Sequence, residues 1–271
     1  MKTIRRGSKG DTVKLMQRLL IQHGYSCDPD GIFGAGTEKQ VRLFQKANGL
    51  DADGIVGTGT WRALEKAETK MAQKDPPGPL PPILTHIQSL GHDIMWEGDY
   101  HLNLFGIRCK SIKPNSFDDI LGCAYTIDDM WRVHYWPGTC DPGTFWLENP
   151  SQVDGTAILV PGQYKDTWKI DKHQGKYEAL CQRAGEVKVY RDANRDNVLD
   201  ESADSIVSGY FGINLHRSSA TGTSTKVEKW SAGCQVHARI AGFNEMMSLA
   251  KRQLQSIKRD TFTYTLINQW W

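Results

Sequence analysis

The sequence predicts two domains of different class: a small all-α module of three helices, followed by a mainly β (β-rich α+β) domain. Two related phrases, DGIFGAGT at 30–37 and DGIVGTGT at 53–60, form an internal repeat. A polar and then proline-rich segment, ETKMAQKDPPGPLPP, follows at 68–82, and β-branched and aromatic runs dominate after it. These observations predict a first domain at 1–67, a linker at 68–82 and a second domain at 83–271.

Each half of the repeat predicts a turn followed by a helix. The Asp-Gly pairs favour tight turns, because glycine tolerates positive φ and aspartate can bond its own backbone. The closing threonines, Thr37 and Thr60, predict helix caps. Apolar residues at helical spacing then predict three helices, with stripes at Val13, Met16 and Leu20, at Val41 and Phe44, and at Trp61 and Leu64.

The segment at 68–82 predicts a boundary, because its prolines cannot continue a helix or a central strand. Beyond it, strands are predicted at 156–160, 186–190, 210–216 and 261–267. A helix is predicted between the last two from the helical spacing of Phe243, Met246, Met247, Ala250, Leu254 and Ile257. We expect that stripe to belong to the core.

Composition excludes few functions. The net charge of +2 gives no reason to expect nucleic acid as a partner. No apolar stretch is long enough to predict a membrane span, and the N-terminus lacks the apolar region of a secretory signal. The six cysteines contain no CxxC pair, which disfavours structural zinc. Disulfides are most plausible among Cys109, Cys123 and Cys140, but the sequence does not assign them.

The segment from His216 to Cys234 holds the candidate catalytic residues. A thiol becomes a strong nucleophile only as thiolate, which needs a base or a cation nearby. His216 ends an alternating strand, so we expect it to share a polar face with Asn214, opposite buried apolar neighbours. Gly233 permits the close backbone approach that an oxyanion pocket requires. Trp230, which we expect near the cleft, and Asn214 are the candidate substrate-binding residues. A buried structural cysteine and a satisfied histidine would also fit the spacing of Cys234 and His216.

The first domain resembles a known family. The phrases IRRGSKGDTVKLMQRLL, GY, DGIFGAGTEKQVRLFQKANGL and DGIVGTGTWRAL occur in the order typical of the type 1 peptidoglycan-binding domain. The resemblance implies a module that holds cell-wall glycopeptide and does no chemistry. The alternative is that the turns and aromatic residues are only the scaffold of a small helical domain.

The second domain carries a pattern of His216, fourteen residues, then Ser231-x-Gly233-Cys234. This resembles the signature of the L,D-transpeptidase (YkuD-like) catalytic domain. The resemblance implies that Cys234 attacks, that His216 is the base, and that the main-chain carbonyl of Arg217 orients the imidazole. Ser231 and Gly233 would shape the loop. The chain departs from the pattern at two positions: Ala232 stands where the family has a second histidine, and Val236 where it has Arg or Asn.

The implied function is acyl transfer on the stem peptides of peptidoglycan, through a thioester and with release of D-alanine. The resemblance implies no cofactor for catalysis, and peptidoglycan as the partner. Two alternatives stay open: a hydrolase such as an endolysin or an injected antibacterial effector, and a wall-binding protein without catalysis. The expected location is the bacterial cell wall or periplasm, reached by lysis, injection or another export route because no signal peptide is recognised.

A second motif predicts a structural calcium site. Asp192, Asn194, Asp196 and Asp200 occupy positions 1, 3, 5 and 9 of a calcium-loop pattern. The pattern lacks glycine at position 6, which is Asn197, and glutamate at position 12. The alternative is a solvated turn held by the hydrogen bonds of its own Asx side chains.

Overall fold

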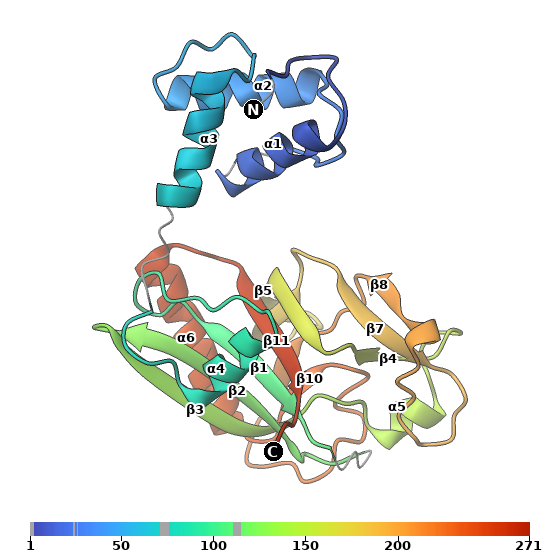
Figure 1. Cartoon of the computed structure of the whole chain (residues 1–271). Helices are drawn as coiled ribbons and strands as arrows, with labels where there is room; N and C mark the ends of the chain where they lie inside the picture. The colour runs from blue at the N-terminus through green and yellow to red at the C-terminus, as the bar shows by residue number, and fades with distance from the viewer. Residues whose placement is uncertain (1–2, 24, 26, 71–75, 111–114) are drawn as a thin grey trace. The chain divides into compact units, whose positions relative to one another are not determined.

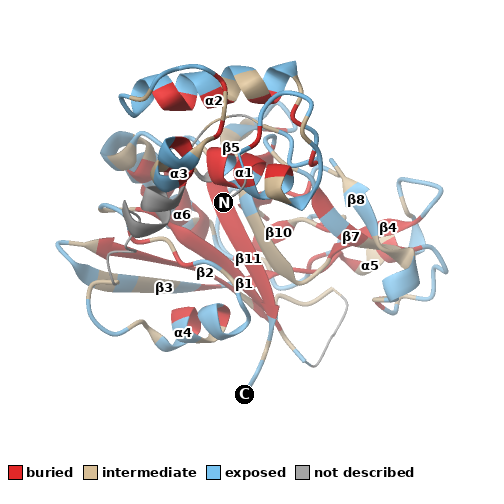
Figure 2. Cartoon of the chain, turned by 45° about the horizontal axis from the view of Figure 1, so that its top comes forward, coloured by how far each residue is buried: buried red, intermediate tan, exposed pale blue. Residues whose placement is uncertain are grey.

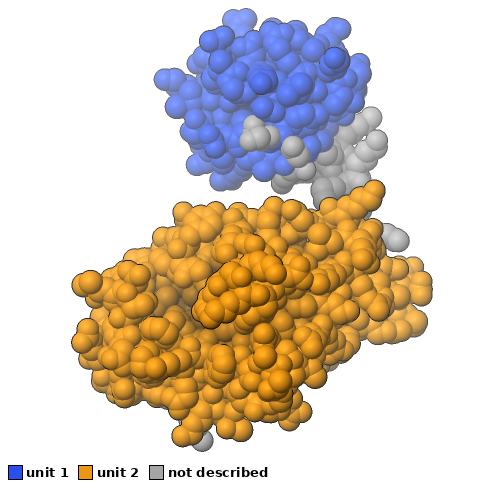
Figure 3. All heavy atoms as spheres, turned by 180° about the vertical axis from the view of Figure 1, so that it is seen from behind, with its two compact units in different colours: residues 1–75 blue, residues 76–271 orange. Residues whose placement is uncertain are grey.

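The structure is a computed structural model that describes residues 3–23, 25, 27–70, 76–110 and 115–271. It divides into two compact units, unit 1 at residues 1–75 and unit 2 at residues 76–271 (Figure 3). Residues 71–75 of the predicted linker lie outside the described residues, as does Gly24 of the first domain. On either side of 71–75, a helix extends to Lys70 and another begins at Pro82.

Unit 1 contains the three helices that the sequence predicts: α1 (Asp11–Gln22), α2 (Ala35–Ala47) and α3 (Thr58–Lys70). One apolar stripe of each helix is buried in a common core. The buried residues include those predicted to face inward: Val13, Met16, Leu20, Val41, Phe44, Trp61 and Leu64. The all-α class of the first domain is therefore confirmed.

The internal repeat is a repeated hydrogen-bond arrangement centred on a buried glutamine. In the first copy, the Gln17 side-chain amide donates to Asp30 at 2.8 Å and to the Ile32 carbonyl at 3.1 Å. Its oxygen accepts the Gly31 N–H at 2.8 Å. The second copy makes the matching contacts at 2.8, 2.9 and 2.9 Å, from Gln45 to Asp53, Ile55 and Gly54. Each glutamine thus fastens an Asp-Gly turn to a helix.

The prediction that Thr37 and Thr60 cap helices is wrong. Gly34 is the N-cap of α2, and α3 already begins at Thr58, so both threonines lie within the first helical turn. Their hydroxyls are used differently, because each receives the amide of its glutamine, at 3.3 Å from Gln17 and 3.1 Å from Gln45. The threonines therefore belong to the turn-fastening arrangement.

Unit 2, in the part of the chain that the structure describes, contains a closed barrel with a smaller sheet beside it (Figure 1). The barrel order is β1-β11-β5-β6-β9-β10-β3-β2, and the smaller sheet has the order β4-β7-β8. The barrel strands are β1 (Asn103–Arg108), β2 (Asp119–Ile127), β3 (Met130–Thr139), β5 (Gly162–His173), β6 (Tyr177–Gln182), β9 (Leu215–Arg217), β10 (Gln235–His237) and β11 (Phe262–Asn268). The smaller sheet contains β4 (Thr156–Leu159), β7 (Val187–Asp192) and β8 (Val207–Gly209).

Helices are few in unit 2, so its β-rich α+β class is also confirmed. They are α4 (Pro82–Ser89), α5 (Thr144–Glu148), the short 3-10 helix η1 (Ala203–Ser205) and α6 (Ile240–Ile257). The predicted stripe of α6 packs in the barrel core through Phe243, Met246 and Ala250. Figure 2 shows the barrel strands β1 and β11 coloured largely as buried. Burying a side chain of the size of Phe243 or Met246 contributes about 1.5–3 kcal/mol. No helix among the described residues is both long and apolar enough to cross a bilayer.

The strand predicted at 210–216 is only partly correct. β8 ends at Gly209 and β9 begins at Leu215, and the residues between them belong to no strand. Gly212 has a φ of 72°, a left-handed conformation that interrupts an extended chain. The strands predicted at 156–160, 186–190 and 261–267 are confirmed as β4, β7 and β11, with shifted ends.

The suggested disulfides are not formed, because all six cysteines are free thiols. Cys123 and Cys140 are each fully buried within the packing of unit 2 and behave there as small apolar side chains. Near Cys140, the buried Arg108 of β1 pairs with Asp141 at 2.8 Å and with Glu201 at 2.6 Å. It also donates to the Leu159 carbonyl of β4 at 3.0 Å, which ties the smaller sheet to the barrel.

Candidate active site

His216 and Cys234 come together through two neighbouring parallel strands. β9 and β10 pair with His216 opposite Val236, and the Gln235 N–H donates to the Asn214 carbonyl at 2.9 Å. Paired residues of parallel strands share a face, and alternate residues along a strand return to it. The side chains of Cys234, Asn214 and His216 therefore lie on one face, as the alternating pattern predicts.

The backbone fixes the proton of His216. Nδ1 lies 2.8 Å from the carbonyl oxygen of Arg217. A carbonyl can only accept, so Nδ1 must carry the proton and Nε2 presents a free lone pair. The Tyr177 hydroxyl donates to the same carbonyl at 3.3 Å. His216 is thus held in the tautomer that a general base requires, and the carbonyl concerned is the one that the sequence resemblance implies.

The sulfur of Cys234 lies among backbone groups. It accepts the Asn214 N–H at 3.4 Å and lies 3.4 Å from the Gly212 carbonyl. Burial raises the pKa of the thiol to about 11, against the lowering effect of the Asn214 N–H. Burial, with a smaller contribution from His173, lowers the pKa of His216 to about 3. Thiol and imidazole are therefore both neutral at pH 7, whereas the sequence argument expected a lowered thiol pKa.

No hydrogen bond joins His216 to the Cys234 sulfur among the residues described. Hydrogen bonds between catalytic groups are often long in a protein without substrate and tighten once substrate binds. Proton transfer between these two groups requires that closer approach.

The loop before Cys234 is shaped by Ser231 and Gly233. The buried Ser231 hydroxyl donates to the Cys234 carbonyl at 2.8 Å and accepts the Gly233 N–H at 3.1 Å. Gly233 has a φ of 115°, and a Cβ at this position would lie 2.1 Å from the Ala157 carbonyl oxygen of β4. Only glycine fits there, but its N–H is already bonded to Ser231 and so is not free to line an oxyanion pocket.

The expected polar face is in fact buried, because residues of the β5–β6 hairpin contact it. Asn214 and His216 are 8% and 3% exposed. The ring of His173, at the end of β5, stacks on His216 with centroids 4.1 Å apart. Its Nδ1 lies 3.1 Å from the Asn214 side-chain nitrogen, whose amide is oriented by the Gln182 N–H at 2.9 Å.

Sequence reasoning missed both His173 and Tyr177. They flank the Gln174-Gly175 turn between β5 and β6. A glycine-containing turn between two strand-like runs could have predicted this hairpin. No spacing motif, however, connects it with the segment from His216 to Cys234.

A pocket of about 620 Å³ opens beside His216. Its lining includes His173, Tyr177, His216, Arg217 and Trp230. The Arg217 guanidinium lies 4.1 Å from the centroid of the Tyr177 ring, and Trp230 is 46% exposed. Trp230 therefore lines the same pocket as the candidate base. Cys234, which is partly buried, is not among the residues that line this pocket.

The predicted calcium ligands lie away from this pocket, at the end of β7. The Asn194 side-chain amide donates to Asp196 at 3.0 Å and to Asp200 at 2.8 Å. Asn197, at the position where such loops use glycine, adopts the left-handed conformation with a φ of 65°. No three His, Cys, Asp or Glu side chains in the described ranges already converge as metal ligands.

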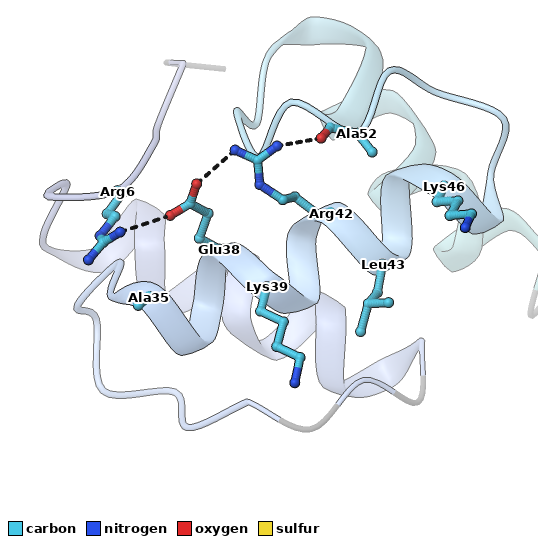
Figure 4. Close-up of a pocket in the computed structure, with 8 residues that line it drawn as sticks. All are labelled: Arg6, Ala35, Glu38, Lys39, Arg42, Leu43, Lys46 and Ala52. Carbon is cyan, nitrogen blue, oxygen red and sulfur yellow. Dashed lines mark hydrogen bonds and ion pairs between the residues drawn. The ribbon is translucent and has the colours of Figure 1, made fainter.

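Unit 1 has a basic pocket of about 470 Å³ along α2 (Figure 4). Glu38 pairs with Arg42 at 2.9 Å and with Arg6 at 3.6 Å. Lys39 also lines the pocket, together with Leu43 and Lys46, and Figure 4 shows Lys39 and Leu43 pointing away from the Glu38–Arg42 pair. No ion pair holds Lys39 or Lys46 within the part of the chain that is described.

Unit 1 is similar to a known protein family. Residues 9–64 match the family described as "Putative peptidoglycan binding domain", which confirms the resemblance of the first domain. A peptidoglycan-binding protein from Clostridioides difficile, solved with glutamine hydroxamate, is 44% identical over 24% of this chain and 42% of its own, with a TM-score of 0.24. The Burkholderia AP3 phage endolysin is 36% identical over 34% of each chain, with a TM-score of 0.24. This chain thus spans less than half the length of either.

The similar structures also include an L,D-transpeptidase. That protein, from Xylanimonas cellulosilytica, is 17% identical over 98% of each chain, with a TM-score of 0.26. The family that residues 216–234 resemble is thus represented among the similar structures. At this TM-score the similarity says nothing about the geometry of the site, so the chemistry proposed below rests on the residues of this chain.

Proposed function

We propose that this chain, with its peptidoglycan-binding module at residues 9–64, is a cysteine enzyme that transfers acyl groups on peptidoglycan stem peptides. One observation carries the proposal. The hydrogen bond from His216 Nδ1 to the Arg217 carbonyl leaves Nε2 as a base, on the strand that neighbours Cys234 and on the same face.

The neutral imidazole of His216 leaves Nε2 able to accept a proton, and because its pKa is about 3 and that of the Cys234 thiol about 11, the transfer requires the closer approach that substrate binding brings. His216 Nε2 takes the thiol proton as the Cys234 sulfur attacks the carbonyl carbon of the third stem-peptide residue. The amide bond to the terminal D-alanine breaks, and the departing amine takes the proton. A thioester remains, which an amine acceptor resolves as a cross-link or exchange, and water as trimming.

The basic pocket of unit 1 supports a role in holding the polymer. Stem peptides carry carboxylates, and Lys39 and Lys46 offer positive charge beside the apolar Leu43. Cations of this kind attract an anionic polymer and bind it more weakly at high salt. The module would thereby bring stem peptides to the second unit.

The test is release of D-alanine from a purified stem tetrapeptide, followed by mass spectrometry. We expect release by the full chain and none by Cys234→Ala. Equal release by the two proteins would contradict the proposal. The products also separate transferase from hydrolase, because cross-linked or exchanged peptides require an amine acceptor and shortened peptides require only water.

A wall-binding protein without catalysis is the second candidate. Two observations favour it: the sulfur has no hydrogen bond to His216, and Cys234 does not line the pocket beside that histidine. This candidate predicts that the chain pellets with purified cell walls while the tetrapeptide stays intact under every condition in which the protein remains folded.

A further inference from the structure

Asp192, at the end of β7, is a buried carboxylate without a matching cation. Its side chain is 0% exposed. One oxygen accepts the Asp200 N–H at 3.2 Å, and the other, Oδ1, has no hydrogen-bond partner among the residues that the structure describes. A buried carboxylate in this state is costly unless a charge or a proton compensates it. By contrast, Asp141, which is also buried in unit 2, pairs with Arg108 at 2.8 Å.

Further oxygen-bearing side chains gather beside Asp192. Asp196 and Asp200 both accept from the Asn194 amide, which brings these three side chains together. No lysine or arginine among the described residues forms an ion pair with Asp192, Asp196 or Asp200. The loop therefore concentrates negative charge that the chain leaves uncompensated.

The backbone of the loop already has the turns that oxygen coordination needs. Arg195 and Asn197 have φ values of 64° and 65°. The Asp196 N–H donates to the Asn194 side-chain oxygen at 3.1 Å, and the Val198 N–H to Asp196 at 2.8 Å. These bonds fold the chain into consecutive turns on which alternate side chains are fixed. In loops of this spacing the seventh position, here Val198, contributes its carbonyl.

We infer that the loop at 192–200 binds one calcium ion, through carboxylates of Asp192, Asp196 and Asp200, the Asn194 side-chain oxygen and the Val198 carbonyl. The unpartnered Oδ1 of Asp192 is the buried ligand. Asn194 must turn its amide, so that oxygen replaces the nitrogen now between Asp196 and Asp200, and the bond that the Asn194 oxygen accepts from the Asp196 N–H is released. This explains why no three acidic side chains converge before the ion binds. An all-oxygen set suits calcium rather than zinc.

The bound ion would stabilise the fold and would take no part in the reaction. Asp192 pairs with Thr156 of β4, and the neighbouring Ala157 carbonyl lies against Gly233, next to Cys234. A ligand that binds only the folded loop would stabilise the sheet supporting the cysteine. Without a bidentate glutamate at position 12, we expect affinity in the range of extracellular modules, about 10⁻⁴–10⁻³ M.

The experiment is a thermal melt of the chelator-treated full chain in CaCl₂ or MgCl₂, with calorimetry for stoichiometry. We expect calcium at ten times its Kd to raise Tm by about 3–6 °C, with one ion bound and a smaller shift in magnesium. Asp196→Asn, an exposed position that should fold normally, and Asp192→Asn should both lose the shift.

Asp204→Asn, outside the ligand set, is the matched control and should keep the shift. The inference is overturned if calcium leaves the wild-type melt unchanged, if Asp196→Asn keeps the full shift, or if magnesium gives an equal one. None of these outcomes depends on turnover of stem peptide, so the calcium site and the proposed enzymatic function are tested separately.

Discussion

His216 is oriented by groups from three segments of the chain. The Arg217 carbonyl fixes its proton, the Tyr177 hydroxyl bonds to the same carbonyl, and the His173 ring stacks on it. His173 is in turn held by the Asn214 amide. The motif in this chain has Ala232 where the family it resembles has a second histidine, and His173 brings a histidine from another strand to the side of the base. We regard His173 as a positioning residue.

We predict that His173→Ala lowers kcat for the stem tetrapeptide by about 10- to 100-fold with little change in KM, because misplacement of a catalytic group has effects of that size. His173→Phe, which keeps the stacked ring, should retain more activity. His173 lowers the pKa of His216, so its removal should raise that pKa and move the acid limb of the rate profile to higher pH. His92→Phe, outside the pocket, is the control, and an unmoved acid limb in His173→Ala would argue against the role.

The thiol of Cys234 should titrate unusually high in the absence of substrate. With a pKa of about 11, its thiolate fraction rises about tenfold for each pH unit across the neutral range. We predict that iodoacetamide labelling of Cys234, followed by peptide mass spectrometry, accelerates with that slope beyond pH 9. A rate that levels off near neutral pH would mean that a thiolate is already formed, and would contradict the general-base account.

For the candidate active site, the sequence predicted the His216–Cys234 motif but not the residues that contact it. Cys234, His216 and the Arg217 carbonyl follow from a local pattern, because strand pairing brings neighbouring segments together. His173 and Tyr177 come from a hairpin more than 35 residues earlier in the sequence, and the pairing of β6 with β9 brings them to His216. The high thiol pKa was equally inaccessible, since burial is a property of the folded core.

Among the elements, the repeated turns of unit 1 depend on two glutamines. Gln17 and Gln45 each make corresponding bonds to an aspartate, a glycine and an isoleucine. The sequence revealed the Asp-Gly phrases but not these partners, because the glutamines lie on preceding helices outside the repeated phrase. The same partners explain why the threonine caps were predicted wrongly.

We predict that Gln45→Ala destabilises unit 1 by about 2–4 kcal/mol, because it removes several hydrogen bonds and leaves the Gly54 N–H without its acceptor. Hydrogen exchange of the amides in α2 and α3 of the full chain is the measurement, since it reports local opening. Lys39→Ala, an exposed change on the same helix, should leave exchange unaltered. Unchanged protection in Gln45→Ala would show that the turn does not depend on this glutamine.

The success of strand prediction in unit 2 depended on local pattern. β4, β7 and β11 are short runs of β-branched or aromatic residues, and periodicity identifies them. β5 is interrupted by charged residues, including Lys165, Asp166 and Lys169, which pair on the surface with distant partners. Its strand character comes from its neighbours β6 and β11 in the barrel, which sequence periodicity does not report.

In the whole chain, the proposed wall binding and the proposed chemistry belong to separate units. We predict that Lys39→Glu combined with Lys46→Glu weakens pelleting with purified cell walls, because it reverses charge in the unit 1 pocket. Turnover of a free tetrapeptide should stay unchanged. Wild-type pelleting should weaken with salt. Equal pelleting of the double variant and the wild type would remove this pocket from the binding surface.

The proposed acyl transfer requires a covalent bond to Cys234, which intact-protein mass spectrometry can detect directly. When the full chain meets a stem tetrapeptide without an acceptor amine, we predict an adduct of the peptide less its D-alanine, mapped to the peptide containing Cys234. The adduct should be absent in Cys234→Ala and formed slowly in His216→Ala. If folded wild-type protein carries no adduct, or carries it at another cysteine, the proposed chemistry is wrong.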